Sequence, residues 1–292
     1  MIEAAVFTDQ TGSVNMPGHT ALPLSQHQQL SRRCALFALM AMSLSIGMGM
    51  LAWGPICLAP NSHLHAAHGI DVVLSLPMLL AGVCGWRVLG RSHWPAVMRT
   101  PWRWCFACLV LSAGLAVAHH LAPSDLGHLA EQTTAAGAFV MLTCGFLAER
   151  VDARFGSARA GAIALAVAGL AGLASWLSAL GLGEPDPRPF LLLQLLPVLL
   201  IPAGVLGLPG SHTHRVDGLL VLGLCAAALG FDLGDGVIAS FTAGAVSGHM
   251  LMHLCLACMV ALWAYRAGTA ASAVTAGDTG LSQTNTSLST SG

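Results

Sequence analysis

Two histidines, His249 and His253, lie four residues apart near the start of the last apolar segment of the chain. Side chains at positions i and i+4 share one face of a helix, so these two imidazoles could bind one metal ion together. Ionisable residues within a membrane span are energetically costly, and they usually mark a functional site with an identifiable partner. His120 and Glu131, each in another apolar segment, are the candidate partners.

The composition predicts a membrane protein. Of the 292 residues, 55% are hydrophobic and 9% are charged, and the mean hydropathy is +0.72. These values exclude an ordinary soluble domain and are typical of a polytopic membrane protein. The net charge is −1 and all twelve basic residues are arginines, so no electrostatic feature favours binding to nucleic acid. Most cysteines fall in apolar segments, where they behave as small hydrophobic residues, and we expect no disulfide framework.

Apolar runs long enough to cross a bilayer, which takes about 20 residues, predict an all-α bundle of eight transmembrane helices. The expected ranges are 34–56, 70–90, 104–122, 132–149, 160–182, 189–208, 217–238 and 244–265. We divide the chain into a disordered tail over 1–31, an extra N-terminal transmembrane helix over 32–57, a seven-helix membrane domain over 70–266 and a second disordered tail over 267–292.

The arginines predict the orientation, because cytoplasmic loops carry an excess of positive charge. Eleven of the twelve arginines fall on one side of the predicted spans, and only Arg188 lies in a loop on the other side. We therefore expect a multi-pass protein of the cell (inner) membrane with both termini in the cytoplasm. At about 1.5 Å per helical residue, His120, Glu131 and His249 lie at matched depths, with His253 one turn deeper. All four are thus expected in the outer leaflet.

The pattern around these residues resembles the alkaline ceramidase family, which belongs to the seven-helix membrane hydrolases together with adiponectin-receptor-type proteins. That family has a serine four residues before its first histidine, an aspartate eleven residues after it and an HxxxH motif in the last helix. Here the matching positions hold Ala116, His120, Glu131 and the pair His249 and His253. The resemblance covers about residues 70–265 and includes the segments 76–82, 120–123, 148–150 and 194–197.

The resemblance implies a zinc-dependent hydrolase with a seven-helix, ceramidase-like domain. His120, His249 and His253 would hold Zn²⁺, and Glu131 would orient a metal-activated water or act as its base. The water would attack the amide of ceramide or another N-acyl lipid that enters sideways from the bilayer. Asp232 is a possible partner for a ligating imidazole, as is Asp235, although a solvated turn is the alternative for both. The sequence indicates no protein partner.

Three departures from the family pattern bear on activity. Ala116 stands where the family has serine, so a hydroxyl that would help to stabilise the reacting oxygen is missing. Glu131 is one methylene longer than the aspartate it replaces. Residues 61–68 contain no acidic side chain, so we expect no calcium site there. These departures leave open a weakened or inactive relative that binds its metal structurally.

A second histidine group offers an alternative metal site. His63, His65 and His68 lie in the predicted outer loop before the 70–90 helix, and short histidine-rich tracts bind transition metals. This group would suit a metal transporter or chaperone, and a purely solvated loop is the other interpretation. His119, next to His120, points about 100° away around the helix and is expected at the membrane interface.

Overall fold

The computed structural model describes the backbone of residues 26–52, 68–92, 94–183, 185–208, 210 and 213–287. Over these ranges the regular structure is entirely helical, as the sequence predicts. The helices are Gln26–Ala52 (α1), His68–Gly90 (α2), Ala96–Leu121 (α3), Asp125–Arg150 (α4), Ala158–Leu182 (α5), Arg188–Gly207 (α6), Arg215–Leu233 (α7), Asp235–Phe241 (α8) and Gly248–Ser287 (α9), with a 3-10 turn at Ala153–Gly156 (η2).

The helices have the length and apolar surface of a membrane-embedded bundle. Among the described residues, five segments are long and apolar enough to cross a membrane, namely Val72–Gly90, Ala96–Leu121, Ala158–Gly181, Arg215–Leu233 and Gly248–Arg266. The apolar parts of α1 and α6 are shorter, over Cys34–Met50 and Arg188–Pro202. Large apolar side chains on the outside remain uncovered, such as Leu44 and Leu180, each 72% exposed. So much exposed apolar surface matches a lipid environment.

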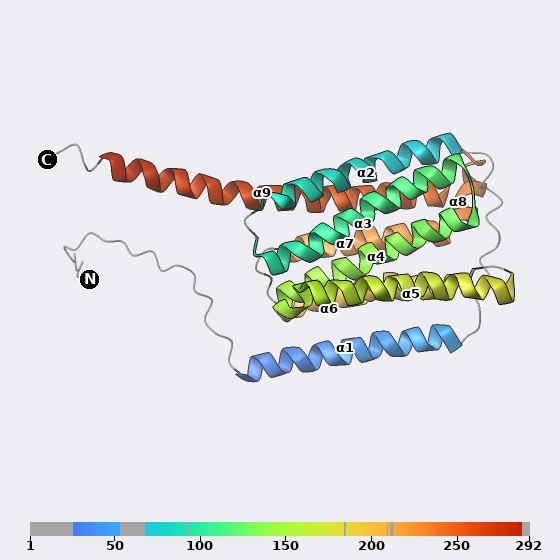
Figure 1. The fold of residues 1–292 in the computed structure, drawn as a ribbon, viewed down its shortest axis with the longest axis horizontal. Helices are drawn as coiled ribbons and strands as arrows, with labels where there is room; N and C mark the ends of the chain where they lie inside the picture. The colour runs from blue at the N-terminus through green and yellow to red at the C-terminus, as the bar shows by residue number, and fades with distance from the viewer. Residues whose placement is uncertain are drawn as a thin grey trace, which may run out of the picture.

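The long helices run alternately up and down, so that each is antiparallel to the next (Figure 1). α4 packs against α3, α5 and α6, and α9 packs against α2 and α7. α4 is 26 residues long and lies inside the bundle, with most of its second half buried. α1 lies at the edge and packs mainly on α6 (Figure 1). The end of α3 and the starts of α4 and α9 therefore meet at one end of the bundle.

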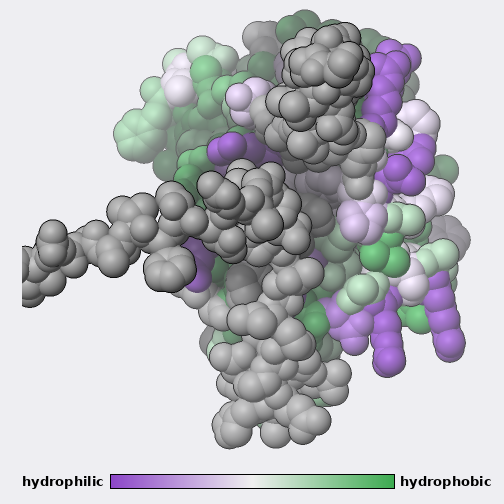
Figure 2. All heavy atoms as spheres, turned by 90° about the vertical axis from the view of Figure 1, so that its left-hand side faces the viewer, coloured by the Kyte–Doolittle hydropathy of each residue, from purple (hydrophilic) through white to green (hydrophobic). Residues whose placement is uncertain are grey.

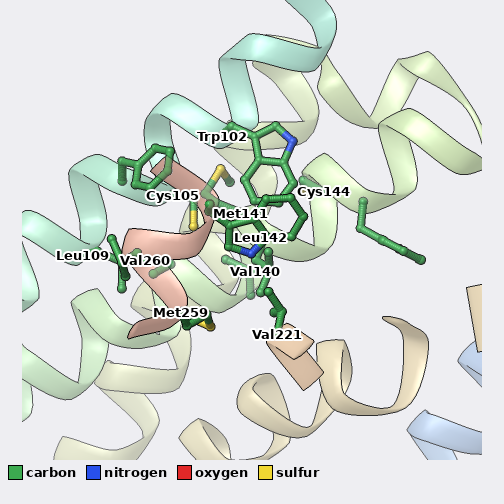
Figure 3. Packing of buried hydrophobic residues seen from close by; sticks show 14 of the residues in the cluster. Trp102, Cys105, Leu109, Val140, Met141, Leu142, Cys144, Val221, Met259 and Val260 are labelled. Atoms are coloured by element: carbon green, nitrogen blue, oxygen red, sulfur yellow. The ribbon is translucent and has the colours of Figure 1, made fainter. Parts of the chain in front are cut away.

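A continuous apolar core joins α3, α4, α7 and α9 (Figure 3). Trp102 of α3 and Trp263 of α9 lie with ring centroids 4.4 Å apart. Met141 of α4 is fully buried, and Val221 of α7 and Val260 of α9 are almost fully buried. This core fixes the relative positions of the helices that carry the histidines.

Hydrophilic residues gather at the opposite end of the bundle, which Figure 2 views directly. There the buried Arg150 side chain, at the end of α4, donates to the backbone oxygens of Leu208 (2.6 Å) and Thr213 (2.8 Å). Glu149 accepts from the Thr213 amide and hydroxyl, both at 2.7 Å. These bonds tie α4 to the connection between α6 and α7.

Several helix ends differ from the sequence prediction. α3 begins at Ala96 and α4 at Asp125, earlier than the expected residues 104 and 132. The predicted span 217–238 is divided at Gly234 into α7 and the short helix α8. The last helix begins at Gly248 instead of residue 244, because Ala243 and Gly244 have positive φ values of 51° and 79° and form a turn. The positive φ of Gly244 is a conformation that glycine adopts without strain.

The C-terminal segment also differs from expectation. α9 continues to Ser287, whereas a disordered tail was predicted over 267–292. The first ten residues of the segment, 267–276, include five residues of alanine, the strongest helix former, which favours continuation of the helix just beyond the apolar span. Most of the predicted N-terminal tail, residues 1–25, lies outside the described residues.

Candidate metal centre

The structure brings His120, His249 and His253 together at one end of the bundle. His120 comes from the last turn of α3, and the other two come from the first turns of α9. One ring nitrogen from each residue lies within 4.8 Å of the others, and the Nε2 atoms of His249 and His253 are 3.1 Å apart. Tetrahedral zinc with bonds of 2.0–2.1 Å requires nitrogens about 3.3 Å apart. Small side-chain shifts would satisfy that geometry.

The burial and chemistry of the three imidazoles also fit a metal ion. His120 and His253 are 3% and 1% exposed, and the His249 side chain is 25% exposed. No described residue is a hydrogen-bond partner for His253 Nδ1. Buried polar nitrogens without partners are unfavourable in an apolar core, whereas converging neutral imidazoles are common metal ligands. The donor set therefore suits a transition-metal ion better than it suits packing.

Both aspartates near Gly234 contact His249, in different ways. Asp232 Oδ1 lies 3.2 Å from His249 Nδ1, whereas Asp235 Oδ1 accepts the His249 backbone amide at 2.9 Å. A proton on Nδ1 that is donated to Asp232 leaves the Nε2 lone pair facing His253 and the centre of the cluster. Asp232 thus orients the ring, and Asp235 fixes the start of α9.

The start of α9 is packed directly against the turn between α7 and α8. A Cβ at Gly248 would clash with the Phe231 backbone oxygen and would lie 2.7 Å from Asp235 Cα. Only glycine allows this approach. Ser247 Oγ accepts the Met250 amide at 3.1 Å and caps the first turn. These local features place the HxxxH pair opposite His120.

Glu131 is not one of the group that could share an ion. It is 6% exposed, in the second turn of α4, and close enough to His249 and Asp232 for electrostatic interaction. A buried carboxylate next to a metal centre can orient a water molecule or accept its proton. Its position is compatible with either role.

The missing family hydroxyl is not replaced by the nearest serine. Ala116 is fully buried on α3, one turn before His120. Ser112, another turn away, donates its hydroxyl to the Glu131 backbone oxygen at 3.4 Å. That hydroxyl therefore joins α3 to α4 instead of facing the histidines.

Several sequence predictions fall outside this site. His63 and His65 lie outside the described residues, and His68 begins α2 without a described side chain. The 61–68 segment, where no calcium site was expected, is therefore almost wholly outside them too. His119 is only 7% exposed, although an interfacial position was expected, because the start of α4 covers it.

The sequence analysis did not single out His128, which lies near the centre. Its ring centroid is 5.4 Å from that of His119. The sequence feature that could have indicated it is its position three residues before Glu131, which puts both side chains on one face of α4.

Two small pockets lie elsewhere, one lined by α1 and α6 and the other by aromatic residues that include Trp94 and Trp102.

No protein-family model matches the chain, and the comparisons with curated proteins and with solved structures also gave no match. The candidate metal centre therefore rests on its own geometry and chemistry.

Proposed function

We propose that the chain is a zinc-dependent membrane hydrolase that cleaves the amide bond of ceramide, a sphingolipid, or of another N-acyl lipid. The observation that carries the proposal is the convergence of three imidazoles from α3 and α9, with the buried carboxylate of Glu131 close enough to His249 for electrostatic interaction. Zinc with three protein ligands and an open position lowers the pKa of a water molecule and polarises a carbonyl oxygen. The resemblance to alkaline ceramidases supports the substrate class.

Each residue of the site has a separate role in the proposed hydrolysis. His120, His249 and His253 would hold the ion, and Asp232 would keep the His249 ring in the tautomer that binds it. Glu131 accepts a proton from the attacking water as the new carbon–oxygen bond forms. When the carbon–nitrogen bond breaks, the same proton passes to the leaving amine, so the products are a carboxylic acid and an amine.

The apolar surroundings support a lipid substrate. Leu121 and Leu126, in the turn between α3 and α4, are each 71% exposed, and Phe241 of α8 is 87% exposed. These side chains surround the end of the bundle that carries the histidines. In the proposed orientation both termini lie in the cytoplasm, and this end lies in the outer leaflet, so an acyl chain would reach the site laterally.

Metal analysis of detergent-purified protein tests the first part of the proposal. We expect about one zinc per chain in the wild type and its loss in His120→Ala and His253→Ala. His214→Ala is the matched control, because His214 is an exposed histidine at the opposite end, just before α7, and should leave the zinc content unchanged. Absence of zinc from the wild type, after purification without chelators, would refute a zinc hydrolase.

A hydrolysis assay tests the second part. N-acyl lipids with different amine groups, presented in mixed micelles, should release free fatty acid with the wild type. Glu131→Gln should retain zinc and lose hydrolysis, because the amide keeps the shape of the side chain but does not accept the proton. Equal hydrolysis by both proteins would exclude Glu131 as the base.

A second candidate function is metal binding without catalysis. The fully buried Ala116 at the serine position favours it, since the Ser112 hydroxyl is used between α3 and α4. On that hypothesis zinc stabilises the bundle and no lipid amide is cleaved. The wild type would then bind one zinc, resist unfolding more strongly with it, and show no hydrolysis with any N-acyl lipid.

A further inference from the structure

A second pair of histidines lies beside the candidate metal centre, at the turn between α3 and α4. His119 is in the last turn of α3 and His128 is in the first turn of α4. Their ring centroids are 5.4 Å apart, with the planes tilted by 41°. The three centroid distances within the metal centre range from 4.7 to 6.0 Å. The pair therefore has the spacing of imidazoles that could share one ion.

The turn is built around His119. A Cβ at Gly127 would lie 2.9 Å from Ser124 Oγ, so the glycine leaves room for that hydroxyl, and it would lie in ordinary contact with His119 Nδ1, at 3.5 Å. The Ser124 amide donates to His119 Nδ1 at 3.4 Å. Because this bond is long, it is weak, and a metal ion could take its place. Because the Ser124 amide can return to His119 Nδ1 when the ion leaves, the site is suited to brief, reversible binding of an ion.

Two carboxylates near His128 favour a cation there, whereas desolvation and the neighbouring imidazoles act in the opposite direction. Asp125 and Asp232 are close enough to interact electrostatically with His128, as are His119 and His249. His128 is exposed, whereas His119 is 7% exposed. Carboxylates beside an accessible imidazole raise the local concentration of metal ions. An ion arriving from solution could thus meet His128 before the buried His120 and His253.

The two sites are joined by neighbouring imidazoles. The ring centroids of His119 and His120 are 5.7 Å apart, and His120 in turn lies 5.9 Å from His249. Exposure falls from the exposed His128 through His119 (7%) to His120 (3%) and His253 (1%), whereas the His249 side chain is 25% exposed. An ion could exchange one imidazole ligand for the next without losing all of them at once.

We propose that His119 and His128 form a low-affinity capture site for a divalent transition-metal ion, which then passes to His120, His249 and His253. The inference rests on the proposed metal centre, and it adds a loading route to it. Two imidazoles with water as the remaining ligands bind zinc more weakly than three imidazoles do, so the ion moves inward.

Metal-loading kinetics test this route. Full-length protein in detergent is stripped of metal, mixed rapidly with Zn²⁺ and followed through a chromophoric chelator. We expect His128→Ala and His128→Gln to load about tenfold more slowly than the wild type, while both reach one zinc per chain at equilibrium. His214→Ala serves as the control and should load at the wild-type rate.

The outcomes separate the two proposals. Unchanged loading rates in both His128 variants, with one zinc bound, would overturn the capture site and leave the metal centre intact. Loss of the equilibrium zinc in these variants would also overturn it, because His128 would then be part of the tight site. A wild type that binds no zinc would refute the metal centre itself.

Discussion

Replacing Asp232 by asparagine should weaken zinc binding by about tenfold. The carboxylate lies 3.2 Å from His249 Nδ1 and is its orienting partner. Loss of such partners reduces metal affinity by roughly 10- to 100-fold. Because the Asp232 side chain is 43% exposed, water competes for the same nitrogen, and the smaller value applies. Tenfold corresponds to about 1.4 kcal/mol of binding free energy.

Asp235→Asn provides the matched control for this prediction. It removes one negative charge from the same turn, but its side chain still accepts the His249 backbone amide, which Asp235 bonds at 2.9 Å. Competition with a chromophoric chelator at neutral pH should show nearly wild-type affinity for Asp235→Asn. Equal losses in both variants would refute the role of the Asp232–His249 contact, because only the shared loss of charge would explain them. A wild-type affinity in Asp232→Asn would refute it as well.

Three further predictions follow from the contacts described above. Ala116→Ser should raise the rate of N-acyl lipid hydrolysis by up to about 100-fold, since it restores a hydroxyl one turn from the metal centre; an unchanged rate would favour metal binding without catalysis. Gly248→Ala should destabilise the protein by about 1–3 kcal/mol and reduce its zinc content, because its Cβ meets the backbone of Phe231; Gly223→Ala, whose Cβ would meet nothing within 4 Å, should leave the zinc content unchanged. Asp186→Asn should lower the melting temperature at neutral pH. Burial by itself would raise the pKa of Asp186, but the hydrogen bonds and charge of Arg188 outweigh it and the net pKa is lowered. Stability from this pair is therefore present above the unfolded-state pKa and is lost as the pH falls through the lowered folded-state pKa, where the variant and wild-type melting curves should converge.

The sequence was sufficient to predict the helical membrane bundle and the meeting of three histidines. Hydropathy reports length and burial in lipid, and the HxxxH spacing fixes two side chains on one helix face. His120 could be added because its depth, counted from the arginines, matched that of His249. These inferences need no knowledge of which helices are neighbours.

The details of the site depended on local contacts that hydropathy does not report. The predicted fourth span began at residue 132, but Ser124 accepts the Gly127 amide at 3.1 Å and starts α4 at Asp125. His128 was therefore left in a loop and was not considered. The division at Gly234 was not placed within the predicted span 217–238, because the apolar residues before Asp232 and after Gly236 were read as one span, although a turn at the two aspartates was the alternative interpretation.

The position of α1 at the edge of the bundle affects how the protein can be assembled in the membrane. α1 packs mainly on α6, and Arg188 at the start of α6 follows Ala52 at the end of α1 by 136 residues. At 5–20 residues per second, synthesis of the intervening chain takes roughly 7–27 s. During that time α1 must remain in the bilayer without its partner helix. Its broad lipid-facing surface, with Phe37 at 71% and Leu44 at 72% exposed, suits a helix that inserts alone and docks late.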